Sequence, residues 1–158
     1  MPASPADDTP KTIPSRAAIA GHPLHPMMVH FPVAALIGVL GADIGWFLTG
    51  DLFWARMGLW LAGVGAVGGW LASIAGLVDL LTVGAIRRLI TGWQHAILAV
   101  MMLSVASLNW LLRLAWGEVV ILPWGMLLGW LTAGLIAMAA FLGGRLVYEK
   151  AVGVEVDS

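Results

Sequence analysis

Four long runs of apolar residues, separated by short polar or turn-forming segments, dominate the sequence. The runs cover residues 27–49, 57–81, 93–112 and about 120–142. Each has room for the roughly 20 apolar residues that a helix needs to cross a bilayer. Connections as short as the ones between these runs place consecutive helices antiparallel. The pattern therefore predicts four membrane-spanning helices.

The composition agrees with this pattern. Of the 158 residues, 60% are hydrophobic and 11% are charged, and the mean hydropathy is +0.92. Soluble domains carry about 25% charged residues, so this excess of apolar side chains has no place in a water-soluble fold. We expect an all-α integral membrane four-helix bundle over residues 21–154. A disordered, proline-containing tail is expected over residues 1–20 and a short C-terminal tail over residues 155–158.

The distribution of cations predicts an orientation. The net charge of −1 gives no basic surface, which excludes nucleic acid as a partner. Of the 8 Lys and Arg residues, Arg56 and Arg113 lie on one side of the predicted membrane. The others lie on the side of the termini: Lys11, Arg16, Arg87, Arg88, Arg145 and Lys150. Cytoplasmic loops are enriched in Lys and Arg, so both termini are predicted to be cytoplasmic.

The absence of cysteine limits the chemistry. The chain has 0 Cys, which excludes iron–sulfur clusters, covalently attached haem and thiolate zinc sites. No nucleophile with a positioned base and no phosphate-binding loop is recognisable. The sequence therefore does not predict an enzyme acting alone, and any metal would be bound by His, Met, carboxylate or backbone oxygen.

Three of the four histidines lie within the segment GHPLHPMMVHFP, and the fourth is His95. A following proline disfavours helical backbone, so His22 and His25 are expected to be extended. With the first helix beginning near Pro26, His30 is expected about one turn inside it, just before a kink at Pro32.

These histidines are expected to meet at the cytoplasmic side. His95 falls in the first turn of the third span, which runs parallel to the first, and His30 is therefore at a similar depth. Asp79, near the end of the antiparallel second span, reaches the same level. Ionisable groups in membrane spans are costly and usually functional, although helix capping or a pairing of Asp79 with Arg87 or Arg88 is an alternative explanation.

A second polar pair is predicted closer to the other side of the membrane. Asp43 and Asn109 follow His30 and His95 at nearly equal spacing on parallel helices, so they are expected to share a depth. We interpret them as a structural hydrogen bond across the bundle, with a proton or quinone site as the alternative.

The opening segment GHPLHPMMVHFP, the four spans and the closing segment GGRLVYEKAVGV resemble the bacterial membrane-protein family called domain of unknown function 2231. The resemblance covers about residues 20–154. It implies a four-helix domain of the bacterial inner membrane. Some relatives are joined to Rieske-type iron–sulfur domains, which points to electron transfer, but this chain lacks the cysteines, so a redox partner would be a separate protein.

Three functions are compatible with these residues. The first is a b-type haem protein with His30 and His95 as axial ligands, exchanging electrons with a separate partner or a quinone. The second is a divalent-metal site built from imidazole and carboxylate ligands. Its candidate ligands are His22, His25, His30, Asp79 and His95. The third is a cofactor-free membrane anchor or assembly subunit, and the oligomeric state is left open.

Overall fold

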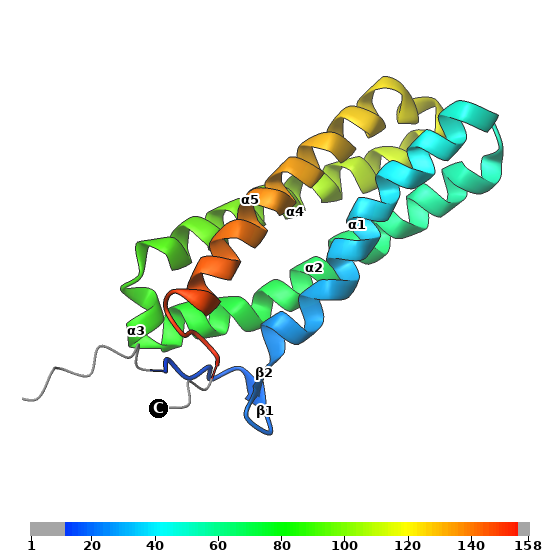
Figure 1. Cartoon of the computed structure of the whole chain (residues 1–158). Coiled ribbons are helices and arrows are strands. Elements are labelled where there is room, and N and C mark those ends of the chain that lie inside the picture. Colours follow the sequence, from blue (N-terminus) through cyan, green and yellow to red (C-terminus); the bar gives the residue numbers. More distant parts are fainter. Residues whose placement is uncertain (1–11, 155–158) are drawn as a thin grey trace, which may run out of the picture.

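Four long helices make up most of the computed structural model, which describes residues 12–154 (Figure 1). They are α1 (Leu24–Thr49), α2 (Leu52–Thr82), α4 (Ile90–Trp116) and α5 (Met126–Tyr148). The short helix α3 (Gly84–Arg87) joins α2 to α4, and the irregular turns η1 (Gly117–Val120) and η2 (Ile121–Gly125) join α4 to α5. Two short antiparallel strands, β1 (Ala18–Ile19) and β2 (His22–Pro23), precede α1.

Glycines end two of the long helices. Gly50 has φ 67°, and its N–H donates to the carbonyl of Trp46 at 2.7 Å, which closes α1. The carboxylate of Asp51 then accepts from the N–H of Phe53 at 2.8 Å and caps α2. Gly117, with φ 63°, follows α4, and the chain reverses before α5 begins at Met126 rather than near residue 120.

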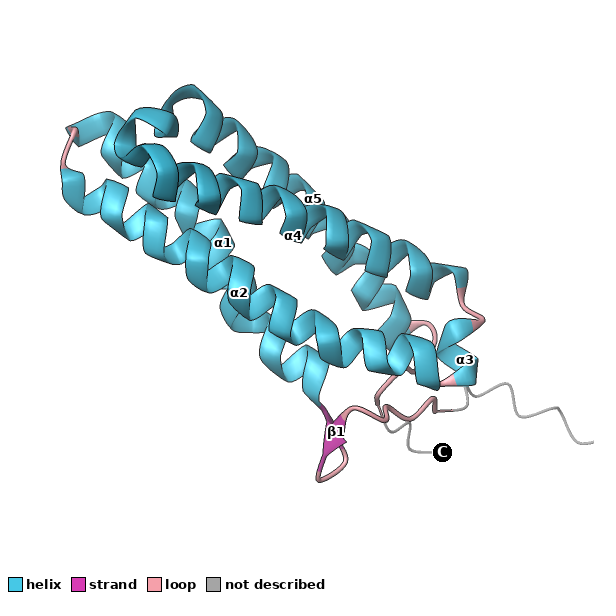
Figure 2. Ribbon diagram, turned by 180° about the vertical axis from the view of Figure 1, so that it is seen from behind, coloured by secondary structure: helices cyan, strands magenta, loops and turns pink. Residues whose placement is uncertain are grey.

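The helices pack in the cyclic order α1, α2, α4, α5, each against its two neighbours, in an assembly that we call the bundle. The hairpins α1–α2 and α4–α5 lie side by side (Figure 2). In this order α1 and α4 occupy opposite corners. The apolar core between the hairpins consists of Leu36, Met102, Leu103, Ala106, Leu135 and Ile136.

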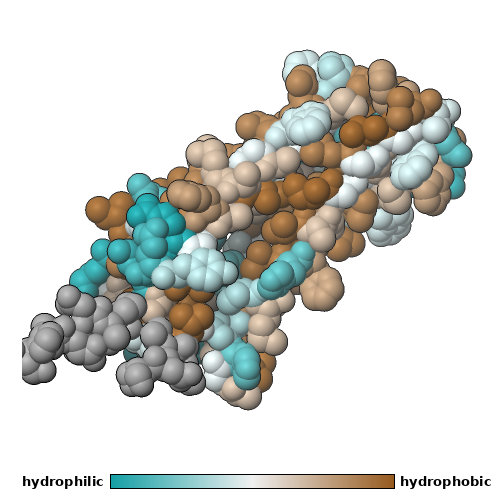
Figure 3. All heavy atoms as spheres, viewed as in Figure 1, coloured by the Kyte–Doolittle hydropathy of each residue, from teal (hydrophilic) through white to brown (hydrophobic). Residues whose placement is uncertain are grey.

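The surface of the bundle is apolar, whereas its interior contains charged groups. Phe31 is 78% exposed and Trp60 is 73% exposed, while Asp43 and Arg113 are only 1% and 2% exposed. Figure 3 shows hydrophobic side chains along the bundle and a hollow between the two hairpins. Apolar groups outside and paired charges inside are what a lipid environment requires.

Three continuous helical segments of the described chain are long and apolar enough to cross a membrane: Leu24–Thr49, Leu52–Thr82 and Ile90–Tyr148. The third has 59 residues and contains the reversal at η1 and η2, so it comprises both α4 and α5. The sequence therefore predicted the number of long helices correctly, while the border between the last two differs.

The segment before the bundle makes specific contacts. Of the tail expected over residues 1–20, residues 1–11 lie outside the described residues, as does the C-terminal tail at 155–158. Residues 12–20 instead lie against one end of the bundle, where Ile13 forms a parallel bridge with Val152. We call residues 12–20 the N-terminal strap.

Candidate functional site

His25 and His95 face each other at the end of the bundle that carries the described chain ends. Their ring centroids are 6.0 Å apart and their planes are inclined by 84°. His25 lies in the first turn of α1 and His95 near the start of α4. Because these helices occupy opposite corners, the two imidazoles meet across the centre of the bundle.

Each ring is held by a hydrogen bond to a backbone carbonyl. Nδ1 of His25 lies 2.9 Å from the carbonyl of Ala72 in α2, and Nδ1 of His95 lies 2.9 Å from the carbonyl of Ala139 in α5. A carbonyl oxygen only accepts, so each Nδ1 carries the proton. In the neutral form of such a ring the Nε2 atom carries the lone pair, which is the arrangement found in metal-binding histidines.

Two glycines make room for these rings. A Cβ added to Gly76 would lie 3.1 Å from Nδ1 of His25, and one added to Gly143 would lie 3.3 Å from Cε1 of His95. Both glycines follow the accepting residue of the same helix by one turn. The site therefore draws on all four long helices, two supplying imidazoles and two supplying an acceptor and space.

His25 is helical, so the prediction that it is extended was wrong. A proline inside a helix acts in two ways: its ring crowds the residue before it, and it removes a hydrogen bond to the preceding turn. Here α1 begins at Leu24, and the first four N–H groups of a helix have no partner within the helix. Pro26 therefore interrupts no hydrogen bond, whereas His22 is extended in β2 as predicted.

The other two histidines do not join this pair. Nδ1 of His22 donates to the carbonyl of Ala20 at 2.9 Å on the exposed strand hairpin. His30 is exposed and makes no hydrogen bond to another described residue. It follows His25 by five positions, and at about 100° per residue this places it about 140° around the helix. The structure thus pairs His95 with His25 and not with His30.

The carboxylate of Asp79 is hydrogen-bonded to the N-terminal strap. Its carboxylate accepts from Ser15 Oγ at 2.6 Å and from the N–H groups of Arg16 and Ala17 at 2.7 and 2.9 Å. The side chain is buried, with 8% of the residue exposed. Among residues 12–154, no three His, Asp or Glu side chains are close enough together to bind one ion.

A buried ionic network lies toward the opposite end of the bundle. The guanidinium of Arg113 donates to both carboxylate oxygens of Asp43, at 2.8 and 2.7 Å, and its Nε donates to Asn109 at 2.9 Å. Asn109 in turn donates to the carbonyl of Gly125 at 3.1 Å. Asp43 and Asn109 thus lie in one network, as their spacing suggested, but Arg113 joins them.

Sequence reasoning placed Arg113 in a connection because the apolar run ends at Leu112. In the structure α4 continues to Trp116, and Arg113 lies inside it. Arg113 follows Asn109 by four residues, which puts both side chains on one helix face. This spacing, together with Asp43 in a parallel helix, was the signal in the sequence that could have identified the network.

The architecture defines a helical protein with apolar, membrane-length segments and paired polar groups inside. The chain belongs to a family described as predicted membrane proteins, DUF2231, which it matches over residues 21–156. This match confirms the resemblance found in the sequence. No curated protein and no solved structure matches the chain.

Proposed function

We propose that the protein crosses the bacterial inner membrane four times, with the described chain ends on the cytoplasmic side. Arg16, Arg87, Arg88 and Lys150 are exposed at that end. Arg113 is buried in an ion pair, which leaves Arg56 as the exposed cation at the opposite end of the described chain. The cation asymmetry behind the proposed orientation is therefore stronger than the sequence count suggests.

Within this membrane domain, we propose that His25 and His95 bind a b-type haem, with His25 in place of the His30 expected from the sequence. The observation that carries the proposal is the pair of facing rings in which both Nδ1 atoms are hydrogen-bonded to carbonyls, which leaves Nε2 as the nitrogen of each ring available to a metal. With metal–nitrogen bonds of about 2 Å, two imidazoles on opposite sides of one metal have ring centres about 6 Å apart. The observed separation is 6.0 Å.

The number of ligands favours haem over a divalent ion. A haem takes two axial ligands from the protein because its own nitrogens supply the rest. Zinc sites use three or four protein ligands. Two imidazoles converge in the structure, and no third His, Asp or Glu joins them among residues 12–154.

The chemistry that such a haem supplies is one-electron transfer. His25 and His95 would hold it and fix its orientation, and the apolar surroundings would keep water away. The paired histidines lie at one end of the bundle, and no histidine lies at the other end. We therefore propose an electron-transfer subunit that exchanges electrons with a separate protein or a quinone.

An absorption spectrum of the purified protein tests this proposal. We expect a Soret band in the dithionite-reduced protein expressed with added haem precursor, and loss of that band in His25→Ala and His95→Ala. His22→Ala and His30→Ala are matched controls that should keep it. A wild-type protein without a Soret band would overturn the haem assignment, and stoichiometric zinc, copper or iron in such a sample would identify a non-haem site instead.

A further inference from the structure

The two hairpins hold their histidines in the same way. His25 of α1 donates to the carbonyl of Ala72 and lies against Gly76 in α2. His95 of α4 donates to the carbonyl of Ala139 and lies against Gly143 in α5. In each case the first helix of a hairpin supplies the ring, and the second helix supplies an alanine carbonyl followed one turn later by a glycine.

The same correspondence extends to the far end of the bundle. His25 and His95 are 70 positions apart, and so are Asp43 and Arg113. In the second helices the corresponding offset is 67 positions, which relates Ala72 to Ala139 and Gly76 to Gly143. The same offset relates Gly58 to Gly125.

Gly58 and Gly125 both make room for the guanidinium of Arg113. A Cβ on Gly58 would lie 2.8 Å from one terminal nitrogen of Arg113, and a Cβ on Gly125 would lie 2.9 Å from the other. One glycine comes from each hairpin. The surroundings of this side chain are therefore alike on both sides, although the residues paired across the centre are an aspartate and an arginine.

These contacts relate the halves by a two-fold rotation. In the cyclic order of the bundle, α1 packs on α2 and α5, and α4 packs on α5 and α2. The pairs His25–His95 and Asp43–Arg113 both cross the diagonal between α1 and α4. In both α1 and α4, 18 residues separate the histidine from the charged residue of the ion pair. This is about 27 Å along the helix at 1.5 Å per residue.

We propose that α1–α2 and α4–α5 are two copies of one internal repeat related by a two-fold axis, and that a metal centre on this axis is bound equally through Nε2 of His25 and Nε2 of His95. Gly76 and Gly143 are the paired positioning residues of this site. The inference rests on the proposed metal function, and it adds that the ligand presents two equivalent positions on opposite faces, as a haem iron does.

Symmetric binding has a chemical consequence. With one imidazole held on each face, His25 and His95 would leave a bound haem iron no open position for a small gaseous ligand. Such a site would transfer electrons without making or breaking a bond to a substrate. The ring planes are inclined by 84°, and a haem bound between imidazoles at this inclination would give a strongly anisotropic low-spin ferric electron paramagnetic resonance signal.

The positioning residues allow a symmetric test. Gly76→Ala and Gly143→Ala each press a methyl group against one imidazole, so we expect both to change this signal and to lower haem occupancy, with occupancies within about twofold of each other. Gly134→Ala is the control in α5, because nothing lies within 4 Å of its added Cβ. Gly68→Ala is the control in α2, where the nearest atom, Cβ of Pro32, is at an ordinary 3.5 Å.

The possible outcomes separate the inference from the function on which it rests. A wild-type protein without haem contradicts the proposed function. Haem that is lost in both His25→Ala and His95→Ala, together with a strong effect of Gly143→Ala and none of Gly76→Ala, contradicts the two-fold site alone.

A charge exchange tests the axis without any cofactor. Asp43→Arg and Arg113→Asp, made singly, each place like charges across the centre and should lower the melting temperature strongly. Gly58 and Gly125 make room for a guanidinium from both hairpins. The double exchange should therefore recover more than half of the melting temperature that the single variants lose. A double variant no more stable than the single ones would overturn the internal two-fold.

Discussion

Asp43 and Arg113 form an ion pair inside the bundle. Because both residues are buried, neither charge is exposed to lipid. Their bidentate contact has N–O distances of 2.8 and 2.7 Å, and both residues are almost fully buried. A single ion in an apolar interior is strongly unfavourable, whereas a paired and hydrogen-bonded one is tolerated. The network therefore links the two hairpins across the diagonal.

Removing the charge of Asp43 should show how far the stability of the bundle depends on the ion pair with Arg113. In Asp43→Asn the guanidinium of Arg113 loses its counter-charge but stays buried, and breaking a buried pair costs about 3 kcal/mol. We expect a clearly lower melting temperature in detergent and an unchanged haem content, because the histidine pair lies at the other end. Asp51→Asn, in an exposed helix cap, is the control, and equal melting of the two variants would contradict the structural role.

Asp79 is expected to determine how firmly the N-terminal strap is held. Asp79→Asn weakens all three hydrogen bonds from residues 15–17, so Arg16 should become a faster site of trypsin cleavage. Ser15→Ala removes one of the three bonds and should have a smaller effect. Cleavage after Arg16 at the wild-type rate in Asp79→Asn would show that other contacts hold the strap.

Single residues were the hardest feature to predict from the sequence. His95 and Asp79 were identified as polar groups at one end of the bundle, and that placement agrees with the structure. The partner of His95 was missed because the preference against helical backbone before proline, a local steric effect, was taken as decisive for His25, although a proline in the first turn costs the helix no hydrogen bond. The start of α1 two residues earlier than expected makes His25 helical, and the sequence argument compared the depth of His30 with that of His95 but not the helix face on which His30 lies.

Glycines set the close approach of the long helices. A Cβ on Gly63 in α2 would lie 2.7 and 2.8 Å from atoms of the Trp110 indole in α4, and one on Gly129 in α5 would lie 2.9 Å from Leu40 in α1. These contacts lie within the chain, which agrees with the packing role of small residues in membrane helices.

Adding one methyl group at such a contact should destabilise the bundle. In Gly63→Ala the rigid indole of Trp110 has to move, and overpacking of this kind costs about 1–3 kcal/mol. Gly134→Ala meets nothing within 4 Å and should be neutral or slightly stabilising, because alanine is the better helix former. Thermal unfolding of both variants in the same detergent measures the difference, and equal melting temperatures would show that Trp110 moves freely.

The apolar pattern predicted the helices better than it predicted their ends. The turn at Gly50 and Asp51 was recognised because it contains both a helix terminator and a cap. The reversal between α4 and α5 was not located, because residues 119–122 are all apolar and continue the pattern of a span. Hydropathy does not distinguish an apolar turn from the beginning of a helix.

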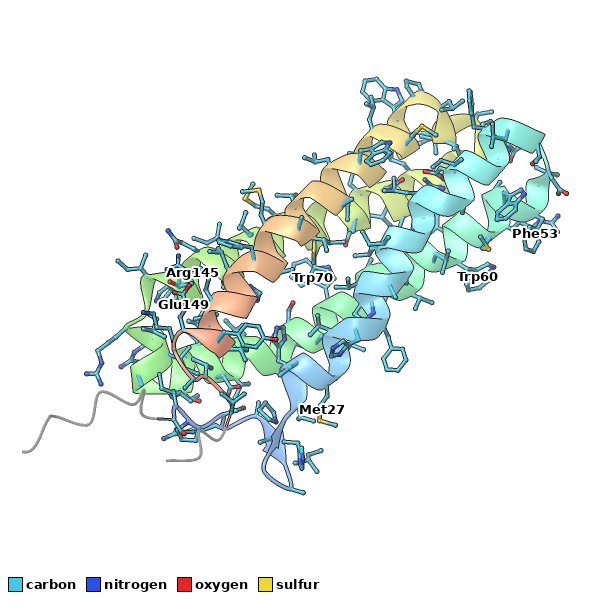
Figure 4. All side chains as sticks on the ribbon, in the orientation of Figure 1. Met27, Phe53, Trp60, Trp70, Arg145 and Glu149 are labelled. Carbon is cyan, nitrogen blue, oxygen red and sulfur yellow. The ribbon has the colours of Figure 1, made fainter. Side chains whose placement is uncertain are left out.

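For the whole molecule, the proposed orientation rests on the Lys and Arg residues at the two ends. Arg145 donates to Glu149 at 2.9 and 3.0 Å, and this hydrogen bond lowers the pKa of the Glu149 carboxyl. Figure 4 shows this pair at the end that carries the termini, whereas Phe53 lies at the opposite end. Besides Arg145, the cations at that end among residues 12–154 are the exposed Arg16, Arg87, Arg88 and Lys150.

Cysteine labelling can test the orientation directly, because the natural chain has 0 Cys. We expect Glu118→Cys to react with a membrane-impermeant maleimide in intact spheroplasts, and Lys150→Cys to react only after the membrane is opened. Both positions are exposed in the structure. The reverse pattern would place the histidine pair on the outer side, and labelling of both from outside would contradict four crossings.

The bridge between Ile13 and Val152 also determines where a domain fused to either chain end would start. The N–H of Ile13 donates to the carbonyl of Ala151 at 3.0 Å, and the N–H of Gly153 donates to the carbonyl of Ile13 at 2.9 Å. Any domain or fluorescent tag fused before residue 12 or after residue 154 therefore starts from the same corner, beside the histidines. Tags on the two ends would report on each other by energy transfer, and a tethered electron donor would have a similar reach to the site from either end.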